Sequence, residues 1–148
     1  MEEILNHDAL IVEAYFLQEC YEICVDLVEK FKKDNKIIMF TLGAIFMIEF
    51  HNEKMMTIAN KCDYIIGNME EALALINNDK NGKKEIIKEG EKNYKKIFEN
   101  FQKKLEKSNN RIAIITNGSE SVICSKYNLD KNQLEFIIQC FTEQIKIR

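Results

Sequence analysis

Short apolar runs alternate along the chain with longer segments whose apolar residues recur every three or four positions. The apolar runs are rich in β-branched and aromatic residues and predict strands at 9–15, 36–42, 62–66, 111–116 and 121–127. The helical spacing predicts helices over 17–33, 68–76 and part of 83–107, and a short helical turn followed by a helix over roughly 52–60. Strands that alternate with helices indicate a mainly parallel sheet in a layered α/β fold, with helices over both of its faces.

The last twenty residues carry a different pattern. Asp130 and Gln133 have capping-box spacing, and the apolar residues that follow recur at helical intervals at Leu134, Ile137, Ile138, Phe141 and Ile145. This pattern predicts a helix over 131–146. We therefore expect a main domain over 1–128 and a divergent C-terminal tail over 129–148.

Ligands of parallel α/β sheets collect at the carboxyl ends of the strands. Here those ends fall at 15–16, 41–46, 67–71 and 116–119. Asn68 and Glu71 have capping-box spacing at the start of a predicted helix, and a cap alone explains the pair completely. The functional interpretation is that the amide and the carboxylate organise a hydrated Mg²⁺ that carries nucleotide phosphates.

The segment Thr116-Asn-Gly-Ser119 joins two of the predicted strands. Asn-Gly is a strong hairpin signal, so a tight turn is the simplest interpretation. The same geometry can present a hydroxyl and backbone N–H groups to phosphate oxygens. Both interpretations stay open at this point.

The amino-acid composition and the net charge limit the classes of function that the chain can have. The chain has 148 residues, of which 46% are hydrophobic and 30% charged, as in one soluble globular domain. A net charge of −3 offers no broad attraction to nucleic acid or to a membrane surface. No apolar run reaches the length of a membrane span, and the first residues lack a signal-peptide pattern, so we expect a cytoplasmic location. Five cysteines then indicate free thiols.

Four segments, in order, resemble the ribokinase/PfkB sugar kinases, and most closely their adenosine kinase branch. "CDYIIGNMEEALAL" is similar to the family's D-I/L-L-x-x-N-x-x-E-A segment, and "RIAIITNGSESVI" to its T-x-G strand and turn. "IVEAYFL" and "KIIMFTLGAIF" resemble two upstream strands that end in aromatic residues. The resemblance covers roughly residues 9–125 and implies part of a three-layer α/β/α domain.

The resemblance also implies a site and its ligands. Asn68 and Glu71 match residues that organise Mg²⁺ and the phosphates of ATP, with Glu71 nearest the metal, and Thr116 and Gly118 match a turn on the nucleotide side. Phe16 and Phe46 match aromatic residues around the nucleoside pocket, although core packing is the favoured interpretation of both from the residues alone. The family phosphorylates adenosine to AMP with ATP in purine salvage.

Two parts of the family pattern are missing. The family carries an Asp-x-Gly-Ala-Gly-Asp loop, which supplies an anion hole and the catalytic base, after the T-x-G strand. No glycine follows Gly118 in this chain, and the N-terminal sugar-binding part is absent. We therefore predict no catalytic residue and no kinase activity for the chain alone. The alternatives are a non-catalytic nucleotide-binding or interaction module, with a partner chain over an exposed sheet edge, or a truncated gene product.

Overall fold

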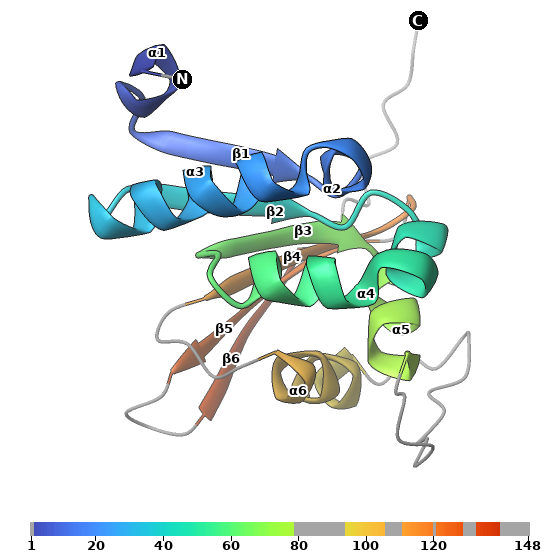
Figure 1. The fold of residues 1–148 in the computed structure, drawn as a ribbon. Helices are drawn as coiled ribbons and strands as arrows, with labels where there is room; N and C mark the ends of the chain where they lie inside the picture. The colour runs from blue at the N-terminus through green and yellow to red at the C-terminus, as the bar shows by residue number, and fades with distance from the viewer. Residues whose placement is uncertain (1, 79–93, 106–110, 120, 129–132, 140–148) are drawn as a thin grey trace, which may run out of the picture.

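The computed structural model describes residues 2–78, 94–105, 111–119, 121–128 and 133–139, and its centre is one six-stranded sheet (Figure 1). The strands lie side by side in chain order: β1 (Ala9–Glu13), β2 (Ile37–Thr41), β3 (Tyr64–Asn68), β4 (Ile112–Asn117), β5 (Ser121–Asn128) and β6 (Gln133–Gln139). The first four are parallel, and β5 and β6 continue the sheet antiparallel. The predicted mainly parallel α/β fold is confirmed.

The helices are α1 (Glu2–Leu5), α2 (Phe16–Glu19), α3 (Tyr21–Lys33), α4 (Ile45–Ala59), α5 (Met69–Asn77) and α6 (Tyr94–Lys104). The predicted helix over 17–33 is divided at Cys20, whose backbone is not helical. Within α4, His51 is also non-helical, as expected for a short turn followed by a longer helix. Among the described helices, none is both long and apolar enough to cross a membrane.

All the larger helices cover the same face of the sheet. Parallel strands that follow one another in chain order, joined by right-handed crossovers, place every connecting helix on one side. The side chains of the sheet that pack against them are Val12, Ile38, Phe40, Ile65, Ala113, Ile115 and Ile123. Figure 1 shows α3, α4 and α6 in front of the strands. The expectation that helices cover both faces is therefore wrong for the described residues, which supply two of the three layers.

Residues 133–139 correct a second prediction. They form strand β6, paired antiparallel with β5, so the predicted helix over 131–146 is wrong at these positions. The reason is that β5 presents unpaired backbone N–H and C=O groups along its outer edge, and pairing satisfies them. The rest of that predicted helix lies outside the described residues. So do residues 83–93 of the helix predicted within 83–107.

Candidate functional site

The four strand ends selected from the sequence lie along one edge of the sheet, because β1 to β4 all run in the same direction (Figure 1). Backbone hydrogen bonds continue past the strands at this edge. The Ala14 amide donates to the carbonyl oxygen of Thr41 at 3.1 Å, and the Leu42 amide donates to that of Ile66 at 2.9 Å. The ends of β1, β2 and β3 are thereby held beside one another.

The predicted capping box is present at the junction of β3 and α5. The Oδ1 atom of Asn68 accepts the Glu71 amide at 2.8 Å, and Glu71 Oε2 accepts the Asn68 amide at 3.0 Å. A third hydrogen bond joins Asn68 Nδ2 to Glu71 Oε1 at 2.9 Å. Only 8% of Glu71 is exposed, so the protein holds this carboxylate in one orientation. The cap interpretation is confirmed, and both carboxylate oxygens already have a donor.

Gly67 makes this arrangement possible, and the sequence interpretation assigned it no role. A Cβ atom at this position would lie 2.7 Å from Leu42 Cδ1 and 3.0 Å from Glu71 Oε2. Only glycine leaves room for the buried carboxylate to pack against the end of β3. The signal was its position directly before Asn68, where a strand becomes a helix.

Thr116 lies beside the capping box. It pairs with Asn68 across β3 and β4, and its hydroxyl donates to the carbonyl oxygen of Gly67 at 3.5 Å. Gly118 has a φ of 55°, which is the left-handed region that glycine favours, and begins the turn between β4 and β5. The predicted turn is confirmed. The structure thus brings Asn68, Glu71 and Thr116 together, with Gly118 just beyond them.

Aromatic side chains lie at the ends of β1 and β2. Phe16 is 58% exposed and Phe46 is 41% exposed, so the favoured interpretation of both as core residues is wrong. The ring of Phe46 meets that of Tyr15 edge to face, with 5.6 Å between the centroids and 62° between the planes. The turn at Gly43, with a φ of 76°, leads from β2 to α4 and so places Phe46 near β1. Tyr15 lies at one of the four strand ends selected from the sequence, two residues beyond β1, but the sequence interpretation assigned it no role.

The residues present suit only a hydrated cation. Among the described residues there is no group of three histidine, cysteine, aspartate or glutamate side chains that could hold a metal ion. Glu71 offers one carboxylate with Asn68 beside it, and Mg²⁺ is commonly held by one or two carboxylates while it keeps several waters. The pair therefore fits a water-mediated Mg²⁺ site.

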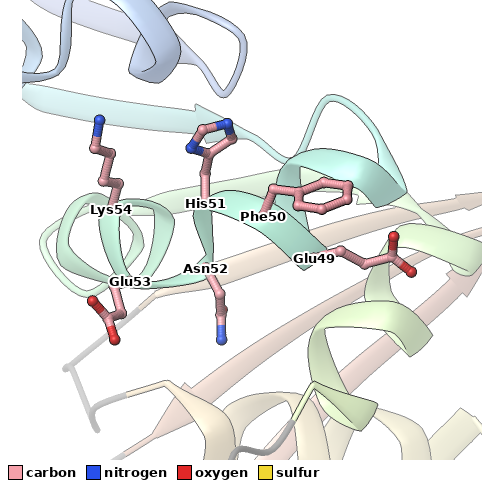
Figure 2. A pocket seen from close by; sticks show the side chains of 6 residues that line it. All are labelled: Glu49, Phe50, His51, Asn52, Glu53 and Lys54. Atoms are coloured by element: carbon pink, nitrogen blue, oxygen red, sulfur yellow. The ribbon is translucent and has the colours of Figure 1, made fainter.

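A separate hollow lies at the kink in α4, where it is lined by residues 49–54 (Figure 2). His51 and Lys54 extend from one side of the helix, and Asn52 and Glu53 from the other. None of the predicted site residues lines this hollow. It is therefore a local consequence of the kink at His51.

No protein-family model matches the chain. The adenosine kinase of Schizosaccharomyces pombe is 26% identical over 117 residues, which are 79% of this chain and 33% of that protein. The chain therefore spans about a third of the length of this curated relative.

Two solved structures share the fold. Adenosine kinase from Anopheles gambiae, in complex with P1,P4-di(adenosine-5) tetraphosphate, superimposes with a TM-score of 0.70 at 20% identity. The match covers 92% of this chain and 38% of the Anopheles chain. Adenosine kinase from Schistosoma mansoni in complex with 2-fluoroadenosine superimposes with a TM-score of 0.72 at 16% identity. The match covers 98% of this chain and 39% of the Schistosoma chain. This chain is thus similar, in sequence and in its ribokinase-like fold, to a part of the adenosine kinases, as its motifs suggested.

Proposed function

We propose that the carboxyl edge of the sheet binds an adenine nucleoside or nucleotide, adenosine or ATP, and that the chain alone does not transfer phosphate. The proposal extends to this chain the adenosine-containing ligands of the Anopheles and Schistosoma adenosine kinases. The observation that carries it is the solvent-exposed Tyr15–Phe46 ring pair at this edge. Exposed aromatic rings held in a fixed geometry offer a stacking surface for a purine base.

The other end of the same edge suits phosphates. The backbone N–H groups of the turn at Gly118 can donate hydrogen bonds to phosphate oxygens, and the Thr116 hydroxyl can do so once it turns away from the Gly67 carbonyl oxygen. The Glu71 carboxylate repels phosphate by itself, so a cation is required between them. A hydrated Mg²⁺ organised by Asn68 and Glu71 meets that requirement.

The lack of phosphoryl transfer is inferred from the sequence. Transfer to adenosine needs a base for its hydroxyl and donors for the developing negative charge. No Gly-Ala-Gly-Asp loop follows Thr116, because the chain has no glycine after Gly118. The four described cysteines are free thiols, which supports the further proposal of a reducing, cytoplasmic setting.

Calorimetry with adenosine and with Mg²⁺·ATP tests the binding proposal. We expect weak but saturable binding by the wild type and a loss of about tenfold in affinity in Phe46→Ala, since stacking on one ring contributes roughly 1–3 kcal/mol. Phe50→Ala is the matched control, because Phe50 is exposed on the same helix outside the Tyr15–Phe46 pair. An absence of binding at millimolar ligand, or an equal loss in both variants, would contradict the proposal.

A further inference from the structure

The kink in α4 is contacted by a side chain of the neighbouring helix α5. His51 interrupts α4 with a φ of −123° and a ψ of 22°. Sharp kinks arise at proline, at glycine or serine, at π-bulges, or where a side chain inserts into the backbone hydrogen-bond ladder. The chain has no proline, and α4 contains no glycine or serine. The Nδ2 atom of Asn78 donates to the carbonyl oxygen of Ile48, three residues before His51, at 2.6 Å, and this inserted side chain accounts for the kink.

The backbone of Asn78 is itself fixed by two hydrogen bonds. Its amide donates to the carbonyl oxygen of Ala74 at 2.9 Å, so Asn78 continues the ladder of α5 by one residue. Its own carbonyl oxygen accepts Lys104 Nζ of α6 at 2.5 Å. A cation at this end of α5 is also favoured by the helix dipole. The Asn78 side chain therefore reaches α4 from a fixed base.

The part of α4 before the kink carries Phe46. Phe46 is five residues before His51, a distance of roughly 7.5 Å along a helix. A change of about 20° in direction at the kink would thus displace it by roughly 2–3 Å. The centroids of the Tyr15 and Phe46 rings are 5.6 Å apart. Because aromatic pairs interact at centroid separations of about 4.5–7 Å, such a displacement is enough to break the contact.

Apolar packing alone does not fix the direction of this segment. Met47 and Ile48 are fully buried and keep it against the core. Apolar burial is non-directional, whereas a hydrogen bond needs a narrow range of distance and angle. The bond from Asn78 to Ile48 therefore selects one direction among those that the core allows.

We propose that Asn78 is a positioning residue, which holds Phe46 against Tyr15 through its hydrogen bond to Ile48 in the kink. It thereby completes the stacking surface at the carboxyl edge of the sheet. Its effect on ligand affinity rests on the function proposed above. Its effect on the ring contact requires no ligand and is tested separately.

Nuclear Overhauser spectroscopy of the protein without nucleotide tests the ring contact. We expect cross-peaks between the ring protons of Tyr15 and Phe46 in the wild type. Asn78→Ala removes the donor to Ile48 and should strongly weaken them. Asn77→Ala is the matched control, because Asn77 is also half-buried and its Oδ1 atom accepts no hydrogen bond within the described part of the chain. Circular dichroism confirms that each variant is folded.

Calorimetry with adenosine tests whether Asn78 acts through Phe46. Asn78→Ala should lower the affinity about fivefold, as expected for the loss of one hydrogen bond. In a Phe46→Ala background the same change should have no further effect, because the ring that Asn78 positions is already gone. A purely structural role would instead lower the affinity by the same factor in both backgrounds.

Three results would overturn the role of Asn78. These are cross-peaks that Asn78→Ala leaves unchanged, cross-peaks that Asn77→Ala also removes, and an equal loss of affinity in both backgrounds. A wild type that binds no adenosine would instead refute the function proposed above. The ring contact, measured without ligand, would then still decide whether Asn78 positions Phe46.

Discussion

At the residue scale, the pair Asn68 and Glu71 is a helix cap that is also proposed to bind a hydrated cation. Both carboxylate oxygens accept hydrogen bonds from Asn68, which fixes the start of α5 against the end of β3. A carboxylate oxygen can accept more than one hydrogen bond, so water on a cation can still reach it. The cap therefore does not by itself exclude a ligand.

Replacement of Glu71 separates these two contributions. Glu71→Ala removes both acceptors and should lower the free energy of unfolding by about 1–2 kcal/mol in urea titrations. Glu71→Gln keeps one acceptor but turns an NH₂ group towards a donor of Asn68, and should cost about half as much. Glu70→Gln, at an exposed position in the same helical turn, is the matched control and should cost little.

The same variants test whether Asn68 and Glu71 take part in binding Mg²⁺·ATP. If the site binds this ligand, millimolar Mg²⁺·ATP raises the melting temperature of the wild type by mass action. The rise should shrink in Glu71→Gln, which lacks the negative charge for the cation, and persist in Glu70→Gln. Equal shifts in all three proteins would leave Asn68 and Glu71 as a helix cap alone.

Cys62 provides a further prediction at this scale. Burial raises the pKa of its thiol to about 12, against the partial opposing effect of Arg111, and the thiol donates to the carbonyl oxygen of Ile58. The reactive thiolate is therefore scarce at pH 8. Iodoacetamide should label the half-buried Cys20 in the native protein and reach Cys62 only in urea, as peptide mapping by mass spectrometry can establish. Labelling of both at equal rates would be the contrary result.

At the scale of elements, α6 packs beside α5 and is held in the main core by aromatic side chains. Phe98 and Phe101 are almost fully buried in the main core, with their ring centroids 6.4 Å apart. Removing one ring leaves a cavity that this packed layer cannot close completely. The stability of α6 thus depends on packing in the main core, because helical propensity alone does not hold so short a helix.

Phe98→Ala should therefore lower the free energy of unfolding by about 3–5 kcal/mol. Lys95→Ala, at an exposed position one turn earlier in the same helix, should change it by less than about 0.5 kcal/mol. Urea unfolding followed by circular dichroism measures both. A Phe98→Ala variant as stable as the wild type would mean that α6 is not part of the cooperative core.

At the scale of the whole molecule, the carboxyl edge and the face opposite the helices, called the open face, are distinct surfaces of one sheet. The edge carries the candidate nucleotide site at the strand ends, and the open face lies across the middle of the strands. Occupation of one surface leaves the other accessible.

Enzyme activity is tested with the whole chain. Purified protein mixed with ATP, Mg²⁺ and adenosine should form no AMP above the rate of a mock purification, because the base and the anion-binding glycines are missing from the sequence. A complete adenosine kinase added to the same mixture is the positive control. AMP formation that follows this chain through successive purification steps would show that another residue acts as the base.

Several features could be predicted from local sequence patterns. The five strands that begin at Ala9, Ile37, Tyr64, Ile112 and Ser121 were expected because their apolar runs are short and rich in β-branched residues. The cap at Asn68 and the turn at Gly118 depend on residues a few positions apart, so their chemistry is readable without a fold.

Other features depend on contacts between distant segments, and only the tertiary structure decided them. Residues 133–139 have helical spacing but pair with β5, since an open sheet edge outweighs a local preference. Phe46 is exposed in α4, and only the fold places its ring against that of Tyr15 from another strand end. One face of the sheet has no large helix over it among the described residues, because the strands follow one another in chain order. No single segment of the sequence encodes that order. Local periodicity thus determined which elements form, and the order and handedness of their packing determined which side chains meet solvent.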